Sequence, residues 1–349
     1  MTERFRTYAS SRWWMAHGNE EVALAADEAV SDFLERNGSS VLVCSRSASA
    51  VISIHARDGR CYMSLYGAPS PMGLSMKGSR LAIGTAFSID VYQTLLGHTG
   101  EAYLLPVSTH LTGAVSIHDV SVEQEGVIFV NTAFSALCTT RADCHFELLW
   151  RPNFVVEEGP VDCCHLNGMA LANSHFGYVT ALGSAPGREG WRALGTDDGV
   201  LINTQTDEIF RGLSLPHSPR IVGQEVWLLE SGRGTLVAIE PSGHKRVIFE
   251  SGGVCRGLDT IGETALIGLS AIRRESQSGP ILHQRFGDQH ESRLILVNTK
   301  ESVCIGTLTL PNIAEISTVL IAPYPKVSFA NRNHREVCST FICRDSLMR

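Results

Sequence analysis

Short apolar runs separated by turn residues fill most of this 349-residue sequence, and they recur in six similar units. Each unit has a polar loop, a strand, a tight turn with Gly or Asn, and a second strand. The units begin near positions 71, 118, 165, 217, 255 and 315, a spacing typical of propeller blades. One unit cannot bury its own faces, whereas six units stacked around an axis can. The sequence therefore predicts an all-β fold, a six-bladed β-propeller.

A residue near the start of each of five units keeps a similar distance to the second strand of its unit. The distance is twelve positions in four units, which contain the pairs Met72 and Gly84, His118 and Val130, His217 and Leu229, and Arg256 and Gly268. His165 precedes Val179 by fourteen positions, across a longer turn at Asn173–Ser174. Equivalent positions of propeller blades fall on one ring around the axis. We therefore expect His118, His165, His217 and Arg256 to converge at one mouth of the channel, with Glu315 as the ring residue of the weaker sixth unit.

The N-terminal region has a different pattern. Residues Glu20–Arg36 place apolar side chains at helical spacing and are followed by Asn37–Gly38, a helix stop signal. We expect a short N-terminal helix within an extension over residues 1–38, followed by the propeller over residues 39–349. The extension is expected either to cap the propeller or to mediate dimer contacts, so the sequence is compatible with an oligomer.

The composition restricts the classes of partner and compartment. Hydrophobic residues make up 44% and charged residues 19%, which is enough apolar material for a full core. The net charge is −7 and no basic tract occurs, so nucleic acid is not expected as a partner. No signal peptide or membrane-length apolar run occurs, which predicts a cytoplasmic protein without a membrane partner. The ten cysteines are expected to be free thiols, and packing is favoured over a redox or ligand role for the Cys163–Cys164 pair.

Several histidine-containing motifs occur in a specific order between about residues 70 and 320, among them "SIHDV" (Ser116–Val120), "CHLNGMAL" (Cys164–Leu171), "PHSPR" (Pro216–Arg220) and "RGLD" (Arg256–Asp259). With them the sequence resembles a family of functionally uncharacterised, mostly bacterial proteins. The resemblance implies a propeller related to the strictosidine-synthase and gluconolactonase group, and it implies no activity. The sequence departs from the family pattern at two places. Val161–Asp162–Cys163 stands where the family has an acidic-basic pair, and His110–Ser116 lacks an acidic residue that the family has.

Two kinds of chemistry suit a ring of three imidazoles. In the first, His118, His165 and His217 bind a divalent metal, Zn²⁺, Fe²⁺ or Mn²⁺, with one position left open for substrate or water. Side chains that could complete or support such a site are Asp119, Asn131, Asn167 and Glu315. No contiguous metal-binding motif occurs, so this hypothesis depends on the ring alone.

In the second, the histidines act without a metal as general acid and base, since imidazole titrates near neutral pH. Asp119 and Asp259 could then orient an imidazole. Arg220 and Arg256 could hold a carboxylate or phosphate of the substrate, or each could pair with an acid of a neighbouring blade. Side chains expected to position the substrate are Asn131, Asn167, Ser218 and Asp259.

Two functions remain open from the sequence. The first is a small-molecule enzyme at the channel mouth, a hydrolase, lyase, isomerase or cyclase acting on an anionic substrate, with natural-product tailoring as an analogy from the fold. The second is a non-catalytic propeller that binds or scaffolds partners. Loops containing Trp191–Arg192 and Arg273–Arg274 are expected over the mouth. Phosphate-binding glycine motifs are absent, so no nucleotide cofactor is expected.

Overall fold

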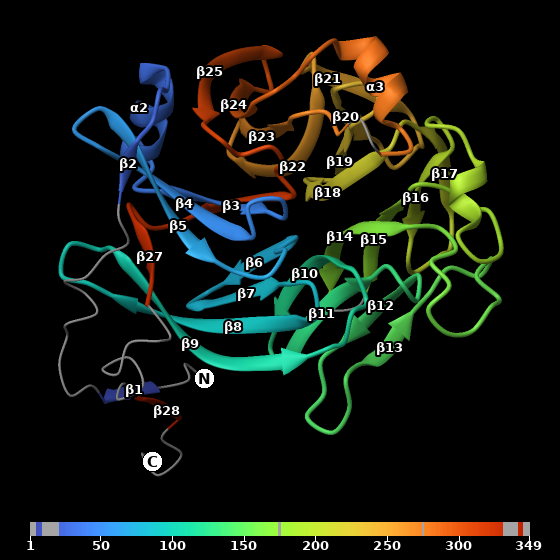
Figure 1. The fold of residues 1–349 in the computed structure, drawn as a ribbon, viewed down its shortest axis with the longest axis horizontal. Helices are drawn as coiled ribbons and strands as arrows, with labels where there is room; N and C mark the ends of the chain where they lie inside the picture. Colours follow the sequence, from blue (N-terminus) through green and yellow to red (C-terminus); the bar gives the residue numbers. More distant parts are fainter. Residues whose placement is uncertain (1–4, 9–20, 174–175, 274–275, 331–340, 345–349) are drawn as a thin grey trace.

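Six β-sheets are arranged around a common centre (Figure 1). The computed structural model describes residues 5–8, 21–173, 176–273, 276–330 and 341–344. Each of the six sheets has four or five strands and forms one blade. The six-bladed β-propeller predicted from the repeat is confirmed.

The blades are numbered here along the chain from β6. Blade 1 comprises β6 (Gly73–Lys77), β7 (Arg80–Gly84), β8 (Ser88–Leu96), β9 (Ala102–Leu111) and β27 (Val327–Phe329). Blade 2 comprises β10 (Ile117–Glu123), β11 (Gly126–Asn131), β12 (Ala136–Thr139) and β13 (Glu147–Trp150). Blade 3 comprises β14 (Leu166–Asn173), β15 (Phe176–Ala181), β16 (Gly199–Asn203) and β17 (Ile209–Leu213).

Blade 4 comprises β18 (Pro216–Val222), β19 (Glu225–Glu230), β20 (Thr235–Ile239) and β21 (Lys245–Glu250). Blade 5 comprises β22 (Val254–Ile261), β23 (Thr264–Ser270), β24 (Ser292–Asn298) and β25 (Val303–Leu310). Blade 6 comprises β26 (Thr318–Ala322), β3 (Ser40–Ser45), β4 (Ala50–Arg57), β5 (Arg60–Gly67) and β2 (Val22–Ala23). A separate pair is formed by β1 (Phe5–Tyr8) and β28 (Phe341–Arg344).

The six sequence units supply the innermost strand of each blade. These strands contact one another around the axis in the order β6, β10, β14, β18, β22, β26 and back to β6. The twelve-residue spacing corresponds to antiparallel register in two blades: His217 lies opposite Leu229, and the amide of Met72 donates to the carbonyl of Gly84 at 3.0 Å.

Segments from opposite ends of the sequence close the ring. Strand β26, late in the sequence, is the innermost strand of blade 6 and pairs antiparallel with β3 from the N-terminal region. A second contact also closes the ring: strand β27, which follows β26, pairs in parallel with β9 of blade 1. The sixth unit is therefore weak in sequence because its blade is assembled from two distant segments.

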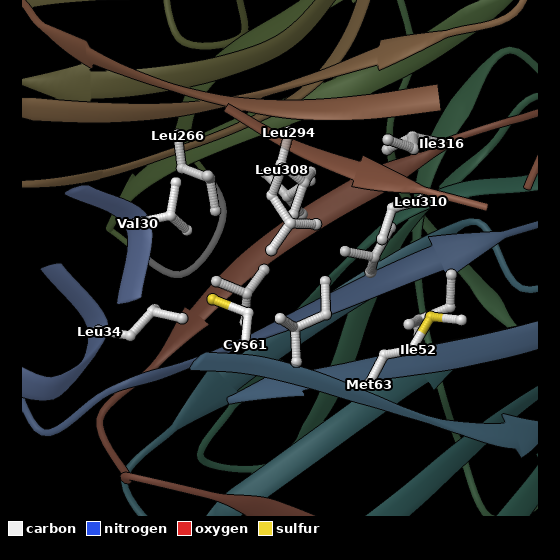
Figure 2. Packing of buried hydrophobic residues seen from close by; sticks show 14 of the residues in the cluster. Val30, Leu34, Ile52, Cys61, Met63, Leu266, Leu294, Leu308, Leu310 and Ile316 are labelled. Carbon is white, nitrogen blue, oxygen red and sulfur yellow. The ribbon is translucent and has the colours of Figure 1, made fainter. Parts of the chain in front are cut away.

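Apolar side chains pack in six clusters, one at each interface between neighbouring blades. At the interface of blades 5 and 6, helix α2 (Glu28–Arg36) adds Val30 and Leu34 to the cluster (Figure 2). The predicted N-terminal helix is therefore present but begins later than expected. Residues Val22–Ala23 instead extend blade 6 as β2, and Glu20 lies outside the described residues.

Candidate functional site

A cavity of about 600 Å³ opens at one mouth of the channel. All six ring positions line it, one from each blade: Met72, His118, His165, His217, Arg256 and Glu315. Its volume falls within the usual range for small-molecule sites. The structure thus brings together the three histidines, the arginine and the glutamate that the repeat placed on one ring.

Irregular backbone occurs at the start of the innermost strands, beside four of these ring residues. The antiparallel register shifts between Ile117 and Val120, between Leu166 and Gly168, between His217 and Arg220, and between Cys255 and Leu258. Shifts of this kind add a residue to one strand and re-aim its side chain, which is why they are common beside active sites. Four consecutive blades share the feature, so it belongs to the architecture of the cavity.

His118 is held through one ring nitrogen. Its Nδ1 lies 3.0 Å from the carbonyl of Ser116 and 2.7 Å from the hydroxyl of Thr132. That hydroxyl donates its own proton to the carbonyl of Leu166 at 2.6 Å, so it accepts from the imidazole. Two acceptors at Nδ1 place the proton there, which leaves the lone pair on Nε2.

His217 repeats this arrangement two blades further along the ring. Its Nδ1 lies 2.9 Å from the carbonyl of Leu215 and 3.0 Å from the hydroxyl of Ser231. The Ser231 hydroxyl donates to the carbonyl of Cys255 at 2.7 Å. The two imidazoles therefore share one tautomer and each presents an unprotonated Nε2.

Thr132 and Ser231 hold the imidazoles of two ring histidines, a contact that the sequence reasoning missed. Each follows its histidine by fourteen residues, and Ser270 follows Arg256 by the same interval. Ser270 also donates to the next blade, at the carbonyl of Ile316. The sequence signal for this contact is a hydroxyl residue at the end of an apolar second strand. The contact joins neighbouring blades, and the hydroxyls of Thr132 and Ser231 also orient an imidazole.

Burial lowers the pKa of His118 and of His217 well below the ordinary 6.5, and the nearby Arg256 lowers both further. His165 also lowers the pKa of His118. Both imidazoles are therefore neutral at pH 7. In the neutral form each Nε2 can accept a hydrogen bond from a ligand.

These pKa shifts predict a pH dependence of stability. A histidine with a lowered pKa in the folded state binds fewer protons there than in the unfolded state. Its effect on the free energy of unfolding is therefore absent above about pH 6.5, and the folded state loses stability as the pH falls below that value. Burial raises the pKa of Asp119 and Asp259, which acts in the opposite direction. We therefore compare variants: between pH 7 and pH 5, urea unfolding of His217→Gln is expected to lose less stability than that of the wild type. An equal loss in both proteins would contradict the assignment of His217 as a neutral group.

His165 differs from the other two histidines because a carboxylate holds it. Its Nδ1 lies 3.0 Å from Oδ2 of Asp162, and its backbone amide donates to Oδ1 of the same side chain at 3.0 Å. Its ring packs against that of His118, with centroids 4.9 Å apart, and against Trp191, with centroids 4.4 Å apart. Asp162 was noticed in the sequence only as a departure from the family pattern, so its role as the partner of His165 was missed.

Opposite charges gather on another part of the wall. Glu315 is buried, with 4% of its side chain exposed, and three arginines surround its carboxylate. Nη1 of Arg256 lies 3.2 Å away, Nε of Arg46 3.5 Å and Nη1 of Arg273 3.6 Å. Burial lowers the pKa of Arg256 to about 10, opposed by Glu315, so its guanidinium remains charged at neutral pH. The group carries a net charge of about +2 from three guanidiniums and one carboxylate.

Two loops form the rim of the cavity. One contains the short helix η1 (Gly190–Ala193), in which the guanidinium of Arg192 stacks on Trp191 at 4.4 Å. The other contains Arg273 and leads to helix α3 (Gly279–Phe286). The two loops meet where the side chain of Gln277 donates to the carbonyl of Arg192. Trp191, Arg192 and Arg273 all line the cavity, as expected for loops over the mouth, and Arg274 lies outside the described residues.

Asp119, Arg220 and Asp259 do not line this cavity. They line a second, smaller cavity of about 250 Å³, further along the innermost strands. The Asp119 carboxylate accepts from the amides of Val120 and Met169, and so joins blades 2 and 3. Asp259 likewise accepts from the amides of Thr260 and Ile321, and joins blades 5 and 6. Neither aspartate contacts a ring histidine, so the expectation that they orient an imidazole is not supported by their placement.

Three expected positioning residues also lie outside the main cavity. Asn131 accepts from the amide of Phe134 and stabilises the turn after β11. Asn167 accepts from the hydroxyl of Thr180, and Ser218 accepts from the amide of Gly257 in the next blade. Asn131 thus stabilises a turn, Asn167 joins two strands of blade 3, and Ser218 joins blades 4 and 5.

No metal-binding group of three or more His, Cys, Asp or Glu side chains is found among the residues that the structure describes. Cys163 and Cys164 are buried in the cluster between blades 2 and 3, and burial raises the pKa of both thiols, that of Cys164 to about 12. Their placement agrees with a packing role. None of the described helices has the length and apolar character needed to span a bilayer.

Comparison with known proteins extends these findings. A chain of the nidogen/laminin complex matches with a TM-score of 0.53 and 10% identity, covering 82% of this chain and 98% of that one. A catalytically inactive virginiamycin B lyase from Staphylococcus aureus, solved with quinupristin, matches with a TM-score of 0.40 and 12% identity, covering 88% and 100%. The first likeness concerns the fold alone. No curated protein matches the sequence. The family model described as "Domain of unknown function (DUF4915)" matches residues 28–330, and the chain therefore belongs to that family.

Proposed function

We propose that this protein is an enzyme that transfers protons on a small anionic molecule bound in the axial cavity. The observation that carries the proposal is the pairing of His165 with Asp162 beside two neutral imidazoles, in a cavity that also contains a cluster of guanidiniums. A carboxylate at Nδ1 fixes the imidazole tautomer and stabilises the imidazolium that forms when Nε2 takes a proton. His165 is the candidate general base, and Asp162 is its positioning residue.

The other groups divide the remaining tasks. His118 and His217 present unprotonated Nε2 atoms that accept hydrogen bonds from hydroxyl or amine groups of the ligand. The arginines around Glu315 attract the anionic group of the ligand, because the planar guanidinium group matches the geometry of carboxylates and phosphates. A proton would move from an acidic O–H, N–H or C–H of the ligand to Nε2 of His165, and return to the product from the same atom. Lyase, isomerase, cyclase and hydrolase reactions all contain such a step.

A test need not begin with a known substrate. The wild-type protein is incubated in D₂O with a panel of carboxylate- and phosphate-bearing metabolites, and proton NMR records loss of C–H signals or formation of product. We expect at least one anionic compound to change in the presence of wild-type protein and not of heat-denatured protein. Ligands that bind without any chemical change would instead support the non-catalytic binding function. A tight stoichiometric metal found by elemental analysis would replace the metal-free scheme with the histidine-bound metal considered from the sequence.

A further inference from the structure

The order of the innermost strands gives the axial cavity two opposed sides. His165 immediately precedes β14, and Glu315 lies three residues before β26. Around the ring these strands are three blades apart in either direction, so they face each other across the axis. A ligand that touches both sides must therefore span the cavity.

The side around Glu315 has an excess of positive charge. Three guanidiniums surround one carboxylate, and both Arg46 and Arg273 are partly exposed, with 44% and 47% of their side chains accessible. Within the described residues, Arg46 uses only Nε, and Arg273 only Nη1, in contacts with Glu315. Among the same described residues, the buried Nε of Arg256 has no hydrogen-bond partner. The remaining N–H groups of Arg46 and Arg273 are available to a second anion.

The chemistry of that anion follows from charge and shape. A phosphate monoester carries between about −1.5 and −2 at pH 7, which balances the excess of about +2. It also concentrates this charge on oxygens around one atom, as a group of arginines converging on one carboxylate requires. A single carboxylate leaves part of the excess unbalanced, and a dicarboxylate distributes its charges over a longer distance.

We infer that the ligand of the axial cavity is a small phosphate monoester, with its phosphate bound by Arg46 and Arg273 beside Glu315 and its reacting group across the axis at His165. This substrate class rests on the proposed function for the reacting end only. The phosphate end depends on the arginines and can be tested separately.

Calorimetric titration at constant ionic strength tests the inference. The probes are inorganic phosphate, glycerol 3-phosphate, malonate and acetate, with chloride as the balancing salt. We expect both phosphates to bind more tightly than malonate or acetate. We expect Arg46→Gln and Arg273→Gln each to raise the Kd for phosphate about tenfold or more, the usual effect of losing a charge-assisted hydrogen bond. The matched control is Arg141→Gln, whose side chain is 45% exposed and pairs with Glu147 away from the cavity, and it should leave the Kd unchanged.

The outcomes separate the two proposals. Malonate or acetate binding as tightly as phosphate, or an equal loss in Arg141→Gln, would overturn the phosphate assignment. His165→Asn should bind inorganic phosphate like the wild type. If phosphate binding depends on Arg46 and Arg273 while His165→Asn retains turnover, the ligand class stands and the proposed proton transfer fails. If His165→Asn abolishes turnover of a ligand that these arginines do not bind, the proposed proton transfer stands and the phosphate assignment fails.

Discussion

Replacing His165 with asparagine is expected to lower kcat for the substrate identified in the D₂O screen by about 10²- to 10⁴-fold, the usual contribution of a positioned general base. The asparagine side chain cannot take up the proton, so the step is lost even where binding persists. Asp162→Asn is expected to lower kcat in the same direction, because the carboxylate that stabilises the imidazolium is removed while the ring remains. Initial rates for the purified variants, measured at saturating substrate, test both expectations.

Asparagine is the appropriate replacement at this position. His165 has a φ of 53°, in the left-handed region where asparagine is tolerated and alanine is strained. Folding is checked by urea unfolding, and the matched control is His244→Asn, which changes an exposed histidine in the turn between β20 and β21. Full activity in His165→Asn, or an equal loss in His244→Asn, would show that His165 is not the base.

Glu315→Gln is expected to lower the free energy of unfolding by about 3–5 kcal/mol. Removing one partner of a buried ion pair leaves the other charge uncompensated, which is the costly way to break such a pair. Arg46 and Arg273 can turn toward water, whereas Arg256 is largely enclosed, with 13% of its side chain exposed. Urea denaturation of the wild type and the variant in chloride buffer measures the difference.

A control and a rescue make this result specific. Glu147→Gln breaks an exposed pair with Arg141 and is expected to change stability by less than about 1 kcal/mol. Inorganic phosphate is expected to restore more stability to Glu315→Gln than to the wild type, because it replaces the missing negative charge beside three arginines. Wild-type stability in Glu315→Gln would mean that the arginines do not depend on this carboxylate.

The ring of six positions could be predicted because the blades repeat. The interval between His217 and Leu229 is fixed by antiparallel pairing within one blade, and such local spacing survives in the sequence. The contact between Arg46 and Glu315 joins residues 269 positions apart. It forms only because β26 closes blade 6 beside β3, and no short-range pattern records that pairing.

The separation of the two cavities was also beyond sequence reasoning. His118 and Asp119 are neighbours in the chain, yet they line different cavities, because side chains alternate in direction along a strand and the register shifts here. The same holds for His217 and Arg220. A motif such as "PHSPR" therefore contains one residue for the candidate site and others that join the blades.

The most direct test of the central claim is a titration of ¹⁵N-histidine-labelled protein with inorganic phosphate, followed by long-range ¹H–¹⁵N NMR. The sequence has thirteen histidines, and the variants His118→Gln, His165→Asn and His217→Gln assign the three signals of interest. If the anion binds in the axial cavity that these imidazoles line, their signals shift together with a single Kd while those of the other histidines stay in place. Independent responses of the three, or shifts confined to other histidines, would contradict a shared ligand site on the propeller axis.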